Sequence, residues 1–158
     1  MGSEKIMPSQ DFKKVYQLLS ARCTKKEISS NEAMKYAAKF DLKLVEKNQL
    51  INQLKKNKFI DHQRYARAFV NDRFKFYKWG KLKIKHHLIQ KGIEERLIDQ
   101  ALNNINQEEY YNLIVHEAKK KQEAIGGLVD FQLRQKLCKY LNQKGFEGDL
   151  VFEIVEKL

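Results

Sequence analysis

LIQKGIE at residues 88–94 returns about fifty residues later as LNQKGFE at residues 141–147. In both copies an apolar residue stands five positions after the glycine, Leu97 in the first and Leu150 in the second. This pattern is typical of the end of one helix, a glycine in the left-handed turn, and the start of another helix. A helical unit that recurs at this distance predicts stacked copies of one module. Stacked modules present long surfaces, which favours the binding of a large partner over small-molecule chemistry.

The rest of the chain is free to be helical, because its one proline, Pro8, precedes the first periodic segment. Apolar spacing and capping residues predict nine helices in three groups of three. Ser29 and Glu32 have the spacing of a capping box, and Asp61 is a good N-cap for a fourth helix. Residues 81–85 alternate polar and apolar side chains as a strand would, but the continuation to the glycine turn favours a helix. We therefore expect an all-α protein.

The repeat also predicts how the chain is divided. The expected parts are a flexible N-terminus at residues 1–8 and repeats at residues 9–60, 61–105 and 106–158. Gly126-Gly127 is the clearest candidate for a hinge. The first repeat is the weakest match, because Lys39 stands where the other copies have glycine.

Helical periodicity also predicts which side chains point inward. In the helix that follows Gly80, we expect one polar side, with an apolar side formed by Leu82, Ile84, Leu88 and Ile89. The polar side comprises Lys83, His87 and Gln90, flanked by His86 and Lys91. In the seventh helix, the expected inward residues are Tyr111, Val115 and Ala118. In the last helix, they are Leu150, Ile154 and Leu158.

The composition favours an anionic partner. The 158 residues include 31 basic and 20 acidic side chains, for a formal net charge of +11. Nucleic acid, an acidic protein face or an anionic membrane surface would suit this charge, although a merely soluble basic protein is the alternative. The two cysteines, Cys23 and Cys138, make no disulfide framework and are expected as reduced thiols in a cytosolic protein. No apolar run is long enough to span a bilayer.

The most unusual local feature is a basic run without any acidic residue, residues 73–91. Its basic residues are Arg73, Lys75, Lys78, Lys81, Lys83, Lys85 and Lys91. Basic groups that local acids do not neutralise bind phosphates, in a way that is independent of sequence and sensitive to salt. The alternative is a solvated helix face. Of the interleaved aromatic residues, we expect Phe74 and Phe76 in the core, whereas Trp79 suits a core position and a stacking contact equally well.

The sequence offers no reaction centre. The four histidines and two cysteines lack the spacing of metal ligands, and no phosphate-binding glycine loop or nucleophile elbow is present. We therefore expect no enzyme activity, no metal and no cofactor.

The central segment resembles a known family. The residues that carry the resemblance are FIDHQRYARAFVNDRF at 59–74, WG at 79–80, LIQKGI at 88–93 and LIDQAL at 97–102. They resemble the RecX family, the regulatory proteins of the bacterial RecA recombinase. The resemblance implies three tandem three-helix repeats in an elongated, curved array. It also implies binding to RecA assembled on DNA, along the filament groove, which would limit filament growth, strand exchange, ATP turnover and co-protease activity.

With this resemblance, the predicted partners are the RecA filament and its single- or double-stranded DNA, contacted through phosphates. We expect a cytoplasmic monomer that does not bind membranes. The predicted contact residues are Arg64, Arg67, Arg73, Lys75, Lys78, Trp79, Lys81, Lys83, Lys85 and Lys91. Two alternatives stay open at this point: a helical protein that binds nucleic acid without RecA, and a scaffold for some other acidic protein.

Overall fold

The computed structural model describes residues 9–126 and 130–158, and these residues form nine α-helices and no strand. The helices are α1 (Gln10–Lys25), α2 (Ser30–Ala37), α3 (Leu44–Lys56), α4 (His62–Lys75), α5 (Lys81–Gln90), α6 (Glu95–Asn103), α7 (Gln107–Ile125), α8 (Phe131–Gln143) and α9 (Gly148–Glu156). The N-terminal segment that was expected to be flexible lies outside the described residues, as does Gly127 of the expected hinge.

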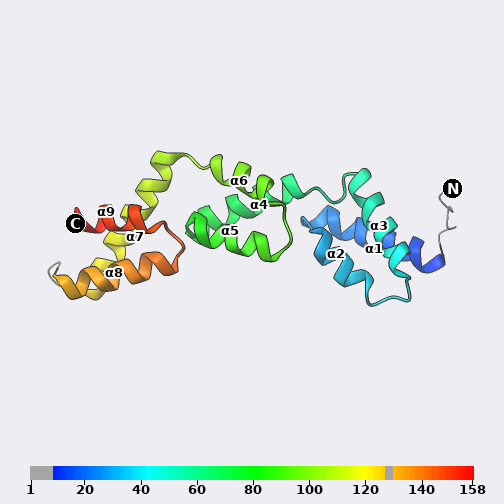
Figure 1. Cartoon of the computed structure of the whole chain (residues 1–158), viewed down its shortest axis with the longest axis horizontal. Helices are drawn as coiled ribbons and strands as arrows, with labels where there is room; N and C mark the ends of the chain where they lie inside the picture. Colours follow the sequence, from blue (N-terminus) through cyan, green and yellow to red (C-terminus); the bar gives the residue numbers. More distant parts are fainter. Residues whose placement is uncertain (1–8, 127–129) are drawn as a thin grey trace.

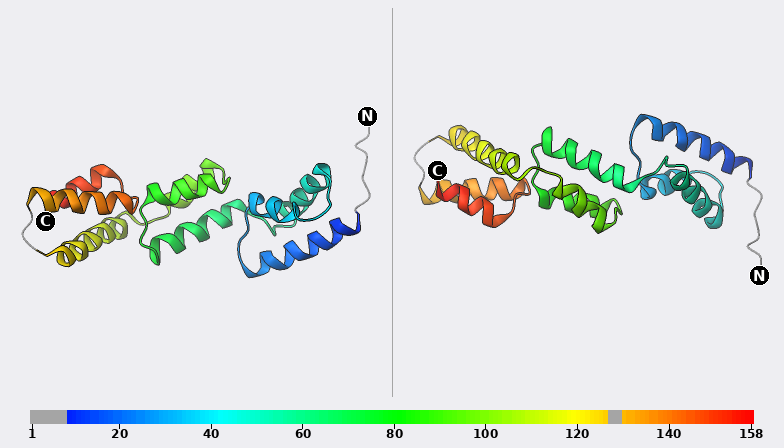
Figure 2. Two further views of the ribbon diagram at one scale, coloured as in Figure 1. Left: turned by 90° about the horizontal axis from the view of Figure 1, so that it is seen from below. Right: turned by 90° about the horizontal axis from the view of Figure 1, so that it is seen from above.

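The helices form three units of three, set in a row. Unit 1 (α1–α3) and unit 3 (α7–α9) lie at opposite ends, with unit 2 (α4–α6) between them (Figure 1). The array is elongated in both further views (Figure 2). The predicted fold class, an all-α array of three-helix repeats, is confirmed.

The capping and turn residues act as the sequence predicts. The Ser29 hydroxyl accepts a hydrogen bond from the Glu32 amide at 3.1 Å, and the Asp61 carboxylate accepts one from the Arg64 amide at 3.0 Å. Gly92 and Gly145, the glycines of the repeated motif, have φ angles of +78° and +94°. An L-residue with a side chain is strained in this region, which explains why both turns carry glycine.

Two hydrophobic cores hold the array together. One core lies within unit 1, around fully buried residues such as Leu19, Leu50 and Leu54. The other is continuous through units 2 and 3 and includes Ile84 and Phe146. Units 2 and 3 therefore share one apolar interior, whereas unit 1 has an interior of its own.

The expected inward residues of α7 and α9 all belong to the core or pack against it. Ala118 and Ile154 are buried as expected, whereas Tyr111, Val115, Leu150 and Leu158 are half-buried. Their neighbours Tyr110, Ile114, Val151 and Val155 are more deeply buried. Helical periodicity identifies the inward side of a helix, but the packing of its neighbours decides which residue on that side is most deeply buried.

The structure also corrects which residues of α5 and of the end of α4 are buried. Leu82 and Ile89 are 55% and 51% exposed, so the apolar side of α5 is confined to Ile84 and Leu88. Phe76, which was expected in the core, is 76% exposed because it caps the end of α4 and projects beyond the bundle. Phe74 packs against the core as expected.

Units 2 and 3 meet through direct backbone contact. The Gly80 amide donates to the Lys144 carbonyl at 2.7 Å, and the Leu82 amide donates to the Gly145 carbonyl at 3.0 Å. The Tyr110 hydroxyl lies beside them, accepting from the Lys81 amide at 3.0 Å and donating to the Glu147 carboxylate at 2.5 Å. This hydroxyl thus links the first turn of α5 to the glycine turn of unit 3.

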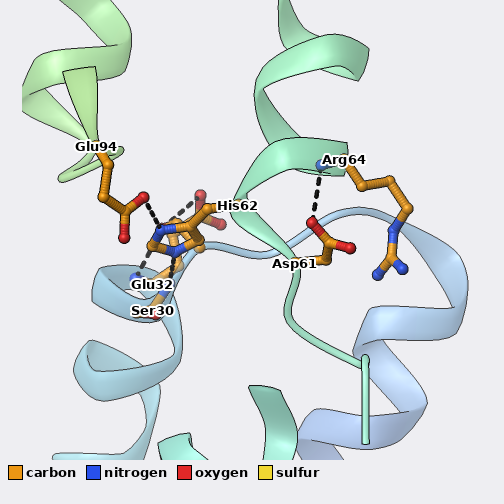
Figure 3. A network of polar contacts seen from close by, with 7 residues as sticks. Ser30, Glu32, Asp61, His62, Arg64 and Glu94 are labelled. Carbon is orange, nitrogen blue, oxygen red and sulfur yellow. Dashed lines mark hydrogen bonds and ion pairs between the residues drawn. The ribbon is translucent and has the colours of Figure 1, made fainter. Parts of the chain in front are cut away.

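Units 1 and 2 meet through a comparable set of contacts around His62 (Figure 3). The Ser30 amide donates to Nε2 of His62 at 3.0 Å, and Nδ1 lies 2.8 Å from the Glu94 carboxylate. Because an amide can only donate, Nε2 carries no proton, and Nδ1 donates to Glu94. Tyr65 adds a hydrogen bond from its hydroxyl to Glu32 of unit 1 at 2.7 Å.

The two junctions follow one rule. In each, the first turn of one unit's second helix docks against the glycine turn of the next unit. A single side chain, His62 or Tyr110, accepts from the first helical amide and donates to the glutamate two residues after that glycine. The repeat in the sequence is therefore a repeat of the joints as well as of the helices.

Candidate nucleic-acid interface

The ten predicted contact residues do not form one surface, because the structure divides them among three places. The first place, around Trp79, holds Arg73, Lys83 and Lys91. The second, near the junction with unit 3, holds Lys81 and Lys85. The third is a groove along α4 that holds Arg64, Arg67 and Lys75. Lys78 stands apart in the linker between α4 and α5, with φ of +58°, and makes no ion pair with any described residue.

The first place, which we name the Trp79 surface, is a cluster of cations held against aromatic rings. It comprises Phe69, Arg73, Tyr77, Trp79, Lys83, His87 and Lys91. The guanidinium carbon of Arg73 lies 4.6 Å from the ring centre of Phe69, 4.5 Å from that of Tyr77 and 5.2 Å from that of Trp79. Arg73 also pairs with Asp72 beside it. Three rings therefore hold one guanidinium in place.

Two lysines complete this cluster from α5 and the turn that follows it. Nζ of Lys83 lies 4.4 Å from the ring centre of Trp79, and Nζ of Lys91 lies 5.8 Å from that of Phe69. Neither lysine pairs with a carboxylate in the described part of the chain. Cation–π contacts orient an ammonium without neutralising it, so both charges stay available to an anion.

His87 reports the concentration of positive charge at this surface. Its ring centre lies 4.6 Å from that of Trp79. Burial lowers the pKa of His87, and the nearby charges of Lys83, Arg73 and Lys91 lower it further. A group whose protonation is opposed by several cations marks a place where an anion would be favoured.

The second place differs from the sequence-based expectation. Lys85 belongs to the run that was predicted to be free of acids, yet its Nζ lies 2.9 Å from Asp99 and 3.1 Å from Glu95 of α6. Hydrogen bonds to these two carboxylates raise the pKa of Lys85. The prediction that the run is not neutralised locally is therefore wrong for Lys85, and it is also wrong for Arg73, which pairs with Asp72. Lys81 lies over the Tyr110 ring at 4.7 Å.

The third place is a groove with a volume of about 570 Å³, which we name the α4–α6 groove. Arg64, Arg67 and Lys75 of α4 line it, together with residues of α6 and the start of α7. Arg64 is committed to Glu27 of unit 1 at 2.5 Å and to backbone carbonyls before α4. Arg67 and Lys75 are exposed and have no carboxylate partner among residues 9–126 and 130–158.

The sequence-based prediction missed part of the Trp79 surface. Phe69, Tyr77 and His87 were not selected, although they hold or border the selected cations. The available signal was helical spacing, because Phe69 and Arg73 are four residues apart on α4, as Lys83 and His87 are on α5. The contacts between the two helices depend on the fold and could not be derived from this spacing.

Neither a metal-ligand cluster nor a membrane-spanning helix occurs among the described residues. No group of three histidine, cysteine, aspartate or glutamate side chains is placed to hold a metal ion. Within that part of the chain, every helix is too short or too polar to cross a membrane.

Comparison with protein-family models gives two matches. The model described as "RecX, second three-helix domain" matches residues 61–102, and "RecX, third three-helix domain" matches residues 107–155. Together the matched residues cover more than half of the chain. The matched ranges fall on units 2 and 3.

Curated relatives bear the name "Regulatory protein RecX". That of Lactococcus lactis subsp. lactis is 32% identical over 133 residues, covering 82% of this chain and 49% of the relative. That of Clostridium acetobutylicum is 32% identical over 123 residues, covering 75% and 56%. That of Clostridioides difficile is 27% identical over 124 residues, covering 78% and 58%. The chain thus spans about half the length of the curated relatives it matches.

Two solved structures have the same fold. The crystal structure of RecX from Lactobacillus salivarius superposes with a TM-score of 0.85 at 22% identity, covering 94% of this chain and 96% of that chain. A crystal structure of regulatory protein RecX gives a TM-score of 0.83 at 24% identity, with coverages of 94% and 72%. The three-unit arrangement is therefore shared with these proteins.

Proposed function

Because this chain belongs to the RecX family, we propose that it regulates the RecA recombinase by binding the RecA–DNA filament along its groove. Bound there, it limits filament growth, and with it strand exchange, ATP turnover and co-protease activity in DNA repair and the SOS response. The proposal places the protein in the cytoplasm as a monomer that acts by binding, without a catalytic residue or a cofactor.

The shape of the molecule supports binding to a polymer. Three units in a row offer an extended flank, which suits a long target better than a small molecule (Figure 1). The formal net charge of +11 favours a polyanion, and DNA within a filament carries one phosphate charge for each nucleotide.

The observation that carries the proposal is the Trp79 surface. Arg73, Lys83 and Lys91 present three cations that aromatic rings hold in place, and this arrangement lowers the entropy lost when each one contacts a phosphate. Such contacts read no sequence, which suits a regulator that must bind a filament on any DNA. Tyr77 is 54% exposed at the edge of the cluster, where a base could stack on it.

The test is a double charge reversal, Lys83→Glu with Lys91→Glu. Binding to RecA filaments on single-stranded DNA should weaken by about tenfold or more at 0.15 M salt. On bare DNA, the slope of log affinity against log salt concentration should fall by about two, because two phosphate contacts are lost. Inhibition of RecA-driven strand exchange should decrease in parallel with filament binding.

The matched control is Lys119→Glu with Lys120→Glu, which makes the same change in net charge at two exposed positions of α7. This control should keep filament binding and inhibition close to those of the unmodified protein. Equal losses in both double variants would mean that net charge alone drives binding, and the Trp79 surface would not be the site. Retention on bare DNA without any effect on RecA would support the alternative of a plain nucleic-acid-binding protein.

A further inference from the structure

The α4–α6 groove lies on the side of α4 that faces away from the Trp79 surface. Arg64, Arg67, Asn71 and Lys75 recur every three or four residues and line the groove along one face of the helix. Arg73, which the Trp79 surface holds, follows Arg64 by about two and a half helical turns and therefore points to the opposite side. Unit 2 thus presents two separate basic surfaces.

The two surfaces differ in chemistry. The groove has an apolar floor of Val70, Ala101 and Ile105, whose residues are nearly covered by their neighbours. Arg67 and Lys75 are exposed cations of the lining, which also includes Asn71, Asn104 and Asn106. Glu109 is the one acidic residue in the lining, among the described residues.

The aromatic content of the groove also differs from that of the Trp79 surface. Phe74 is the aromatic residue of the lining in the described part of the chain, and its ring packs 6.2 Å from that of Tyr110. It is half-buried and part of the wall, so it offers little open face on which a base could stack. A phosphate chain would find two uncommitted cations here, but it has no apolar group to cover the floor.

We infer that the α4–α6 groove binds an acidic segment of a partner protein, with an apolar side chain seated on the floor and carboxylates paired with Arg67 and Lys75. The inference rests on the proposed function, and it divides the filament between the two faces of unit 2. RecA protein contacts the groove, whereas DNA phosphates contact the Trp79 surface. A volume of about 570 Å³ accommodates a few side chains of such a segment.

The start of α7 closes one end of the groove but does not attract a carboxylate. Asn106 is the N-cap of this helix, and Glu108 and Glu109 already lie in its first turn, where they offset the partial positive charge of the helix end. The attraction for carboxylates therefore comes from Arg67 and Lys75. The groove combines these cations with an apolar floor, and an acidic peptide with an apolar residue uses both.

Two variants test the groove separately from the Trp79 surface. Arg67→Glu with Lys75→Glu reverses the two exposed charges of the lining, and Asn71→Trp fills the groove without changing any charge. At 0.15 M salt the Debye length is about 8 Å, less than the diameter of α4 with its side chains, so a charge change in the groove affects the opposite face little. Both variants should bind a bare 30-nucleotide oligo(dT) within about twofold of the unmodified protein. Both should lose about tenfold or more in affinity for RecA filaments.

Lys83→Glu with Lys91→Glu is the reciprocal variant and should lose affinity for bare oligo(dT). Circular dichroism checks that each variant keeps its helices. A photo-crosslinking residue at position 71 adds a direct readout: it should attach to RecA in the filament, and not to the DNA.

The outcomes separate the inference from the proposed function. If the unmodified protein does not co-sediment with RecA filaments, the proposed function is wrong and the inference fails with it. If it does co-sediment, but the groove variants bind filaments normally, the inference alone is overturned. Crosslinking from position 71 to DNA, or no crosslinking in a filament that binds the protein, would also overturn it.

Discussion

At the scale of single residues, the Trp79 surface shows how a small helical protein can fix long, flexible cations in place. Arg73 contacts three rings, and Lys83 lies over the same indole from the neighbouring helix. The rings hold the charges in place, and Lys83 and Lys91 have no carboxylate partner among the described residues. His87, against the same indole, provides a probe of this surface.

His87 should respond to a bound polyanion. Its pKa is lowered from an ordinary value of 6.5 by burial and by the surrounding cations. Phosphates at this surface would screen those cations, so DNA should raise the pKa of His87 back toward 6.5. Because the bound pKa is the higher one, binding takes up protons. Affinity should therefore rise as the pH falls through the interval from the bound pKa to the free pKa.

The measurement is an NMR titration of the histidine ring protons with and without a saturating oligonucleotide. His116, an exposed residue of α7 in unit 3, provides the internal reference for the ring-proton signals. An unchanged titration of His87 in the complex would place the phosphates elsewhere.

Tyr110 should matter for stability through its hydroxyl alone. This buried group accepts from the Lys81 amide and donates to Glu147. Burial and the neighbouring carboxylate of Glu147 raise the pKa of Tyr110, so it remains a donor. Tyr110→Phe leaves an amide and a carboxylate without this partner and should lower the free energy of unfolding by about 1–3 kcal/mol. Urea denaturation measures the change.

Tyr111→Phe is the control for this variant, because Tyr111 is a half-buried neighbour on the same helix. It should change the free energy of unfolding by less than about 0.5 kcal/mol. Equal effects of the two substitutions would mean that the Tyr110 hydroxyl does not stabilise the junction.

At the scale of elements, each glycine turn lies in close contact with the second helix of the preceding unit. A Cβ atom on Gly145 would lie 2.3 Å from Cβ of Lys83 and 2.6 Å from its backbone nitrogen. On Gly92 it would lie 2.2 Å from Nδ2 of Asn31, an exposed side chain that can move away. The contact at Gly145 is therefore the more rigid of the two, since the backbone of α5 cannot yield without moving unit 2.

Three glycine substitutions should separate close approach from backbone strain. Gly126→Ala meets no atom within 4 Å but has φ of +73° and ψ of 138°, so it should cost only the backbone strain, about 1–3 kcal/mol. Gly80→Ala has an ordinary φ of −78°, but its Cβ would lie 2.2 Å from the Gly145 backbone, so it tests close approach alone. Gly145→Ala combines both and should be the most destabilising, by about 3 kcal/mol or more.

Thermal or urea unfolding of the three variants checks this order. A Gly145→Ala variant no less stable than Gly126→Ala would contradict the close contact between units 2 and 3. The Gly80→Ala variant should also weaken the coupling of these units, because the steric conflict lies at their interface.

The sequence predicted the helices better than it predicted their environments. Caps such as Ser29 and Asp61 are local, so helix starts could be derived from a few neighbouring residues. Tyr110 is more deeply buried than Tyr111, and its hydroxyl donates to Glu147, a residue 37 positions away. Likewise, residues 73–91 contain no acidic residue, but the fold brings Asp99 of α6 into contact with Lys85. Contacts between units carry no periodic signal, so the candidate site could be predicted only in part.

At the scale of the whole molecule, the two cores divide the protein unevenly. Units 2 and 3 share an apolar interior, whereas unit 1 is attached to them largely through polar contacts around His62 (Figure 3). Units that share an interior unfold together, while a unit with its own interior can unfold first.

Paired core substitutions should reveal this division. Leu50 and Leu137 are both fully buried, the first in the unit 1 core and the second in the shared core. Each change to alanine should cost about 2–5 kcal/mol locally. The single tryptophan, Trp79, lies in unit 2, so its fluorescence reports that part of the chain. Far-ultraviolet circular dichroism reports the helices of all three units.

Leu50→Ala should give an early loss of helix signal while the Trp79 transition stays in place. Leu137→Ala should move the Trp79 transition to lower urea concentration. If both variants shifted both signals equally, the protein would unfold as one cooperative unit, and unit 1 would not be separable.

The rule of the two junctions has a consequence for how such proteins change length during evolution. Each joint takes one half from the second helix of a unit and the other half from the glycine turn of its successor. A gene duplication that copies the middle unit would therefore supply both halves of the new joint at once, a helix start and a glycine turn. Arrays of this design can gain or lose whole three-helix units. A longer array would extend further along its target without a new kind of interface.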